Sequence, residues 1–323
     1  MPFDSDFDRK TAITASEAVA VIFPKDSPWK TPMQVFESKI APGTSDNVDT
    51  MFTRLGNYLE PFIGAACTQE YGWNLVEATK TKRHPIYDFI AATPDFLDAN
   101  GKFGVEVKAI FKTTQEWGDE TENIWSADEL PVPVRYAVQC VINMAVHNVW
   151  RWELVALIDG KLHRYGVPRN LDYESHCIKA LKEFWNDHVL ANVPPPVVKN
   201  DENWLKKKFP NSSGVMITDE KNELKDLIGQ YLQQRKQLEM LEADVGAIRS
   251  QLILMIRDAD GISGDWGKVT YKSTKETEKT DWDLVALELS MKLGNKEFYD
   301  ETVKRFTKKQ PGSRRFLFTG AKK

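Results

Sequence analysis

Hydrophobic residues recur at spacings of three and four along much of the chain, which is the pattern of helices that bury one face. In the N-terminal part this pattern predicts a short helix around residues 18–22 and longer helices over 32–40, 48–67, 133–146 and 173–190. A proline falls inside the helix at 48–67, and a proline is tolerated there only if the helix kinks.

Runs of alternating apolar and polar residues between these helices predict strands. A strand pair is expected within residues 71–87, and two more strands at 149–157 and 161–167 flank the turn residues Asp159-Gly160. The clearest unit is 93–109, where Asn100-Gly101 is a hairpin turn signal between two short strands.

The pattern changes beyond the three consecutive prolines at 194–196. From Leu224 to Met255 the apolar residues follow a heptad spacing that only Gln234 interrupts. This predicts one long helix over about 223–256, whose apolar seam must be buried against another subunit, the rest of the chain or its own tail. A short hairpin, two helices and a basic ending follow, so we divide the chain into a core of residues 1–200 and an extension of residues 201–323.

Composition narrows the class of protein. The chain has 323 residues, 41% of them hydrophobic and 28% charged, as in soluble globular proteins. The net charge of −4 does not suggest a nucleic-acid binder in bulk, although a basic lining can be local. Cys67, Cys140 and Cys177 lack metal-site spacing, which indicates reduced thiols in a cytosolic protein and excludes a four-cysteine iron–sulfur cluster. We expect no membrane span and no signal peptide.

The predicted hairpin places candidate chemistry side by side. In its second strand Val105 and Val107 point to one face, and Glu106 and Lys108 point to the other. Closure of the hairpin brings Asp95 alongside. Asp95, Glu106 and the Val107 carbonyl offer the hard oxygen ligands that Mg²⁺ prefers, and Lys108 can orient or help deprotonate a water that attacks a phosphodiester. Taken alone, a salt-bridged surface hairpin explains the pattern equally well.

Other candidates lie outside the hairpin. Arg9 and Ser16 stand at the start of the first helix, where a helix N-terminus with a hydroxyl and a nearby arginine suits a phosphate; a plain N-cap is the alternative. Glu60 immediately precedes the helical proline, so it is either held in place or simply solvated. Gln139 is polar within an apolar helix and needs a partner, which a bound water, Lys108 or a backbone carbonyl can supply.

Two tryptophans, Trp117 and Trp125, occur in the polar segment 110–129. They either stack on nucleic-acid bases or cover the edge of the core. The basic ending at 305–323 is either a DNA contact or a frayed tail.

Five short motifs occur along this chain in the same order as in one known family. They are Arg9 with Ile13-Thr-Ala-Ser16, then Gly56-Asn-Tyr-Leu-Glu60-Pro, Ala92-Thr-Pro-Asp95, Glu106-Val-Lys108 and Tyr136-Ala-Val-Gln139. Together they resemble the lambda exonuclease/YqaJ family of phage recombination nucleases, within the PD-(D/E)XK superfamily, over about residues 9–190. The resemblance implies an α/β, restriction-endonuclease-like core with a mixed central sheet flanked by helices, followed here by the long helix and a small α+β appendage.

The resemblance also implies a function. It is a Mg²⁺-dependent 5′-to-3′ exonuclease that digests one strand of linear double-stranded DNA and leaves 3′ overhangs for a single-strand annealing protein. Two Mg²⁺ ions, replaceable by Mn²⁺, are expected at one site, in the cytoplasm of a bacterial host cell and in a homo-oligomer, by resemblance a trimeric ring. The implied residues are Asp95, Glu106, Val107 and Glu60 at the metals, Lys108 and Gln139 beside them, and Arg9 and Ser16 at the 5′ phosphate.

Two rival functions remain open from the sequence. One is an endonuclease of the same superfamily, restriction-like or repair-linked, which would cut covalently closed DNA where an exonuclease would not. The other is a non-catalytic DNA-associated scaffold built on the long helix, with the hairpin as a structural relic. The presence of Glu60, Asp95, Glu106 and Lys108 argues against the scaffold, and a metal titration would distinguish it.

Overall fold

The computed structural model describes residues 7–41, 50–111, 116–127, 129–219, 222, 224–273, 281–292 and 296–307. The chain divides into two compact units, Met1–Lys208 and Phe209–Lys323, which are considered separately below. Most of the basic ending, from residue 308 onwards, lies outside the described residues.

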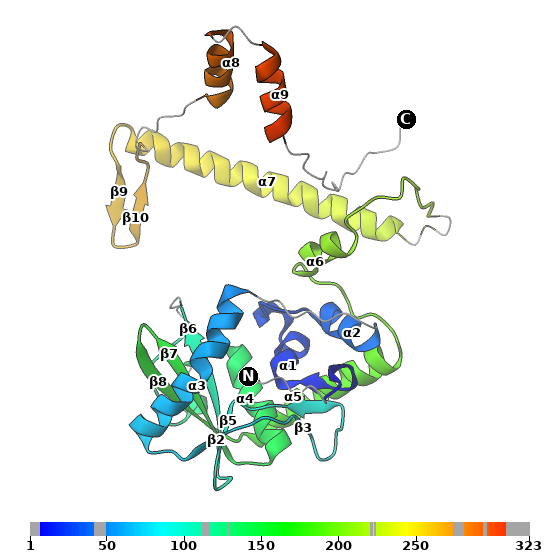
Figure 1. The fold of residues 1–323 in the computed structure, drawn as a ribbon, viewed down its shortest axis with the longest axis vertical. Helices are drawn as coiled ribbons and strands as arrows, with labels where there is room; N and C mark the ends of the chain where they lie inside the picture. Colours follow the sequence, from blue (N-terminus) through cyan, green and yellow to red (C-terminus); the bar gives the residue numbers. More distant parts are fainter. Residues whose placement is uncertain are drawn as a thin grey trace. The chain divides into compact units, whose positions relative to one another are not determined.

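A five-stranded sheet forms the centre of the first unit (Figure 1), in the order β2-β5-β6-β7-β8. Its strands are β2 (Leu75–Glu77), β5 (Phe96–Asp98), β6 (Gly104–Ile110), β7 (Arg151–Ile158) and β8 (Lys161–Pro168). β6 and β7 run parallel and the other neighbours are antiparallel, so the sheet is mixed. The expected mixed α/β core is confirmed.

A smaller sheet holds β1 (Ile13–Thr14), β4 (Ile90–Ala92) and β3 (Lys82–Arg83), in the order β1-β4-β3. The predicted strand pair within 71–87 is therefore wrong, because β2 pairs with β5 and β3 pairs with β4. The segment between β2 and β3, 78–81, reads Ala-Thr-Lys-Thr and contains none of the turn residues that close a hairpin. Without a local turn, each strand pairs with one further along the chain.

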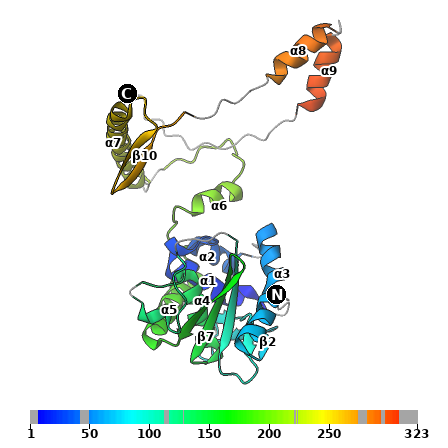
Figure 2. The same ribbon diagram turned by 90° about the vertical axis from the view of Figure 1, so that its left-hand side faces the viewer.

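Helices cover both faces of the central sheet. Figure 2 shows α1 (Ala15–Ile22), α4 (Val134–His147) and α5 (Leu171–Phe184) on one side and α3 (Met51–Tyr71) on the other. α4 brings a nearly continuous buried surface to the larger core cluster, where it meets α1, α5, β7 and β8. α3 contributes Ile63 and Cys67 to a second cluster with Phe96, Val105 and Val107. The sheet that carries the hairpin thus lies between two apolar layers.

A glycine lets α3 approach the hairpin closely. A Cβ on Gly64 would lie 2.3 Å from Cζ of Phe96, so only glycine allows this spacing between helix and strand. Pro61 lies inside α3 without ending it. Because Phe96 follows Asp95 and Gly64 lies one helical turn after Glu60, this contact fixes how α3 lies over the hairpin.

A buried ionic cluster holds the N-terminal segment. Glu17 of α1 accepts hydrogen bonds from Lys39 Nζ at 2.7 Å and Lys30 Nζ at 3.1 Å, which connects α1 to α2 (Pro32–Ile40) and the loop before it. Burial alone would raise the pKa of Glu17, but the charges of Lys39 and Lys30 outweigh it and lower the pKa to about 2. Burial lowers the pKa of Lys39, and the 2.7 Å contact with Glu17 opposes that effect.

The short elements η1 (Arg9–Thr11), η2 (Pro24–Asp26), η3 (Ile124–Ser126), the π-helical η4 (Trp185–Leu190) and α6 (Asp201–Lys208) complete the first unit. Trp117 and Trp125 are half-buried and pack against the core, Trp117 beside Tyr136 and Trp125 beside Tyr173. Of the two expectations for these tryptophans, this packing favours the cover over the core edge.

The second unit is dominated by the 32-residue helix α7 (Lys225–Ile256). A hairpin of β9 (Gly261–Gly264) and β10 (Gly267–Thr270) follows, and then α8 (Trp282–Lys292) and α9 (Lys296–Phe306) (Figure 1). The predicted long helix is confirmed. Among the described residues, none of the helices has the length and apolar character that crossing a bilayer requires.

Candidate active site

The register of the β5–β6 hairpin creates the site. Phe96 pairs with Val105 and Leu97 with Gly104, so the residues one step further, Asp95 and Glu106, face each other across the two strands. The turn between them uses Gly101 at φ +70, a conformation that favours glycine. The alternation and turn signal of the sequence predicted this hairpin, and the structure contains it.

Asp95 occupies an open edge of β6. Pro94 has no N–H to donate, and β5 begins only at Phe96, so β6 continues beyond its partner on that side. The amide of Val107 donates instead to Asp95 Oδ2 at 2.7 Å. Because the N–H and C=O of one residue in a strand point the same way, the Val107 carbonyl faces the same open side as Asp95.

Glu106 is completely buried and held from several sides. Its Oε1 accepts hydrogen bonds from Lys108 Nζ and, at 2.5 Å, from Gln139 Nε2, and its Oε2 accepts one from Asn143 Nδ2 at 3.3 Å. Gln139 and Asn143 are four residues apart on α4, so both amides project from one face of that helix. The partner of Gln139 is therefore Glu106, and not Lys108 or a backbone carbonyl as the sequence analysis suggested.

The carboxyl groups of the site have raised pKa values. Burial raises the pKa of Glu106 to about 8, and the nearby charge of Asp95 adds to the rise. Burial also raises the pKa of Asp95, against the opposing effects of Lys108 and the Val107 amide. Glu60, on α3, has its pKa raised to about 7, first by burial and then by the charge of Asp95. Three acids thus lie close enough to disfavour one another's ionised forms.

Lys108 is the cation of this cluster. Its ammonium contacts Glu106 and lies 5.4 Å from the centre of the Tyr136 ring. Burial would lower the pKa of Lys108, but the charges of Glu106 and Asp95 outweigh it, so the pKa lies above its usual value. Lys108 is therefore protonated and donates hydrogen bonds.

The donor set fits a divalent cation of the Mg²⁺ type. Among the described residues, no three His, Cys, Asp or Glu side chains are gathered into a complete ligand set. Mg²⁺ does not need one, because it keeps several waters and is commonly held by one or two carboxylates. Asp95 and Glu106 supply these, the Val107 carbonyl adds a third oxygen, and a cation would relieve the mutual repulsion that raises the carboxyl pKa values.

Arg9 and Ser16 form a separate group. Arg9 is half-buried and contacts Thr14 Oγ1 at 3.5 Å, and Thr14 in turn lies 3.2 Å from Ser16 Oγ at the start of α1. The two residues are thus close to each other through Thr14, as the sequence analysis expected. The Arg9 carbonyl also accepts a hydrogen bond from Lys39 Nζ at 2.8 Å, which connects this group to the Glu17 cluster.

Asn143 is the site residue that the sequence analysis missed. It is fully buried, and its Oδ1 accepts no hydrogen bond in the described structure. The available signal was its spacing, since it lies four residues after Gln139 in a helix that is otherwise apolar on that side. Tyr136 was quoted only as part of a motif, although its ring borders Lys108.

The fold and the site agree with the class that the motifs suggested, because a mixed sheet whose β-hairpin carries an aspartate, a glutamate and a lysine is the arrangement that the PD-(D/E)XK resemblance predicted. Residues 7–149 match the family model of the YqaJ-like viral recombinase domain. The resemblance drawn from the five motifs is confirmed. Domain and site together support a nuclease.

The individual proteins that this chain resembles share little of its sequence. The chain is 24% identical over 264 residues to the protein YqaJ of Bacillus subtilis (strain 168), which covers 80% of each chain. In shape it is similar to an alkaline exonuclease from Laribacter hongkongensis, with a TM-score of 0.45, 17% identity and coverage of 62% of this chain and 95% of the other. A phage-related exonuclease from Haemophilus somnus 129PT gives a TM-score of 0.40, 13% identity and coverage of 56% and 96%.

Proposed function

We propose that this protein is a Mg²⁺-dependent exonuclease that digests one strand of linear double-stranded DNA. The observation that carries the proposal is the pairing of buried Asp95 and Glu106 across the hairpin, with the Lys108 ammonium on Glu106. A salt-bridged surface hairpin would leave these carboxylates in water, whereas here their pKa values are raised. Such perturbed acids are typical of functional sites.

Each residue then has a role. Asp95, Glu106 and the Val107 carbonyl would hold one Mg²⁺, and Glu60 would reach a second; Mn²⁺ would substitute. When bound, the ions supply charge stabilisation for an in-line displacement at phosphorus. Lys108, as a protonated donor, would orient the attacking water or a phosphate oxygen. Gln139 and Asn143 would fix the rotamer of Glu106 by holding both of its oxygens.

The direction of digestion is part of the same proposal. Ser16 is exposed at the N-terminus of α1 and Arg9 lies nearby, and these groups suit the 5′ phosphate of a DNA end. Holding that end would give 5′-to-3′ digestion. The product would be a 3′ single-stranded overhang, which a single-strand annealing protein would use in recombination.

Assembly and location complete the proposal. A homo-oligomeric ring, trimeric by the family resemblance, would stay on its DNA by topology, so a net charge of −4 is no obstacle. The cytoplasm of a bacterial host cell is the expected location, and the three buried free cysteines are compatible with a reducing compartment.

The test uses linear duplex DNA with a label on one strand, with and without a 5′ phosphate, in the presence of Mg²⁺. The expected result is loss of the 5′-phosphorylated strand from its 5′ end, no loss without divalent ion, and survival of covalently closed circular DNA. Cleavage of the closed circle would identify an endonuclease. DNA binding without cleavage, together with no measurable binding of Mg²⁺ or Mn²⁺, would favour the scaffold.

A further inference from the structure

The helix α7 carries an apolar seam on its surface. Its heptad positions a and d are Leu224, Leu227, Tyr231, Gln234, Leu238, Leu241, Val245, Ile248, Leu252 and Met255. Eight of these residues are more than a third exposed although they are large and apolar, among them Leu241 at 60% and Ile248 at 57%. At 32 residues the helix is about 48 Å long and spans more than four heptads, enough for a coiled coil.

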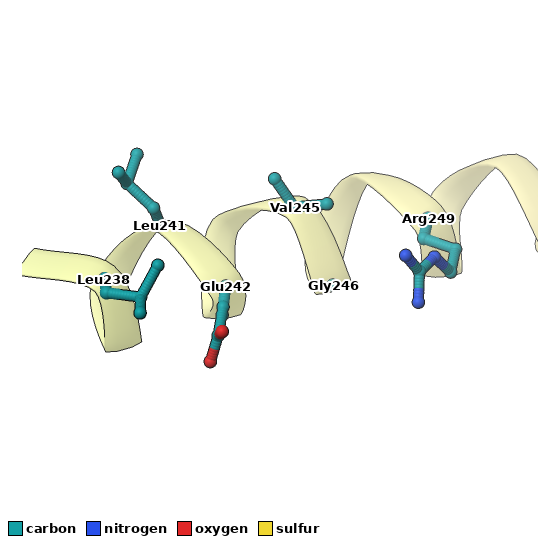
Figure 3. A pocket seen from close by; sticks show the side chains of 6 residues that line it. All are labelled: Leu238, Leu241, Glu242, Val245, Gly246 and Arg249. Carbon is teal, nitrogen blue, oxygen red and sulfur yellow. The ribbon is translucent and has the colours of Figure 1, made fainter. Parts of the chain in front are cut away.

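The apolar seam of α7 borders a hollow on the helix surface. This hollow is lined by Leu238, Leu241, Glu242 and Val245, and extends along Gly246 and Arg249 (Figure 3). The first four are at positions i, i+3, i+4 and i+7, which is the set of four residues that receives a knob from a facing helix. In a parallel, in-register pair, the knob at this height is Leu241 of the second helix.

We propose that α7 pairs with α7 of a second copy of this chain, in a parallel and in-register coiled coil that joins copies through the second unit, separately from the ring proposed for the nuclease core. Gln234 supports this arrangement. In a parallel pair Gln234 faces its own equivalent, so the two side-chain amides can hydrogen-bond to each other. In an antiparallel pair with full overlap Gln234 faces Val245, which leaves a polar amide without a partner in an apolar layer.

Charges beside the seam fit the same pairing. Asp244 occupies a g position and Arg249 the e position five residues later, and these two positions lie side by side across a parallel coiled coil. A parallel pair of chains therefore brings Asp244 of each copy next to Arg249 of the other. Residues five apart on one helix are not neighbours, so this attraction arises only between chains.

A cysteine experiment on the full-length chain tests the orientation. Ile248→Cys, at a d position, should form an interchain disulfide under mild oxidation, because the two copies of residue 248 face each other in a parallel pair. In the antiparallel arrangement residue 248 faces residue 231, about 25 Å from the other copy's position 248. Ala243→Cys, on the outer face, is the matched control and should not crosslink. The native cysteines are buried.

A charge exchange tests the partner. Asp244→Arg and Arg249→Asp should each weaken self-association about tenfold in sedimentation, and the double variant should restore it. Three results would each overturn the proposal: a parent protein with the mass of a single chain, crosslinking no better at residue 248 than at 243, or no recovery of association in the double variant. A single-chain mass would mean that the seam is covered within one chain. Lys108→Ala should associate like the parent, so this test is independent of the nuclease activity.

Discussion

A buried carboxylate needs several partners, and Glu106 has three: Lys108, Gln139 and Asn143. Lys108 and Gln139 donate to Oε1, and Asn143 donates to Oε2. Lys108 neutralises the carboxylate, and the two amides of α4 fix its two oxygens. These contacts fix the Glu106 carboxylate in one orientation toward Asp95 before any ion or DNA arrives, which is what a site of this kind requires.

Lys108→Ala should abolish DNA cleavage while leaving DNA binding within about threefold of the parent, because one ammonium contributes little to a wide DNA interface. Lys102→Ala is the matched control, since Lys102 lies exposed at the turn of the same hairpin. Strand-release and filter-binding assays on the same substrate measure the two effects. Cleavage by Lys108→Ala at the parental rate would show that the role given to Lys108 is wrong.

Asn143→Ala should raise the Mg²⁺ concentration needed for half-maximal activity, or lower kcat, by about 10–100-fold, as is usual for residues that orient a metal ligand. Glu106 Oε2 loses its amide donor in this variant, so the carboxylate is free to turn. A Mg²⁺ titration of activity is the measurement, with circular dichroism as a check on folding. A folded variant with an unchanged Mg²⁺ dependence and kcat would contradict the positioning role.

At the scale of elements, the site depends on how closely α3 lies against the hairpin. Gly64→Ala places a methyl group 2.3 Å from the Phe96 ring and should lower the free energy of unfolding by about 1–3 kcal/mol. It should also impair cleavage, because α3 must move away and take Glu60 with it. The control is Gly56→Ala on the same helix, which meets nothing within 4 Å and should be neutral or stabilising by up to about 1 kcal/mol. Equal free energies of unfolding for the two variants in urea would show that the close packing of Gly64 against Phe96 does not matter for stability.

The cluster around Glu17 makes the position of α1 pH-dependent. The pKa of Glu17 is about 2 in the folded chain and 4.5 when unfolded, so its contribution to stability is present above pH 4.5 and is lost as the pH falls toward 2. The difference corresponds to about 3 kcal/mol. Glu17→Gln should lower the free energy of unfolding at pH 7. It should also reduce the loss of stability that the parent shows as the pH falls below 4.5.

Glu37→Gln is the matched control for Glu17, because Glu37 lies on α2 and makes a partly exposed ion pair with Lys208. Its effect should stay below about 1 kcal/mol. Chemical denaturation of both variants between pH 7 and pH 3 gives the comparison. If the free energy of unfolding of Glu17→Gln falls as steeply with decreasing pH as that of the parent, other carboxylates cause the loss of stability.

The sequence predicts the parts of this site that depend on local pattern. The turn at Asn100-Gly101 and the alternation of 105–108 give the hairpin, and the hairpin register places Asp95 opposite Glu106. What could not be predicted depends on contacts between distant segments. The proximity of Glu60 to Asp95 rests on the packing of Gly64 against Phe96, and the partners of β2 and β3 lie well beyond the next turn.

At the scale of the whole molecule, catalysis and association are assigned to different parts of the chain. The acidic site belongs to the first unit, and the apolar seam belongs to α7 in the second. The long helix was predicted from the heptad spacing alone, because that spacing is a local property. The spacing does not name the partner of that helix, and the proposal of a second copy adds the heptad positions of Gln234, Asp244 and Arg249.

The central claim is that Asp95 and Glu106, with Glu60 nearby, hold divalent cations. A crystal of the protein soaked in Mn²⁺ tests this claim most directly, through the anomalous scattering of the ion. The account predicts an anomalous peak within coordination distance of Asp95 and Glu106 and of the Val107 carbonyl, and its loss in Asp95→Asn. A fully occupied Mn²⁺ site elsewhere, with no peak beside these two carboxylates, would contradict it.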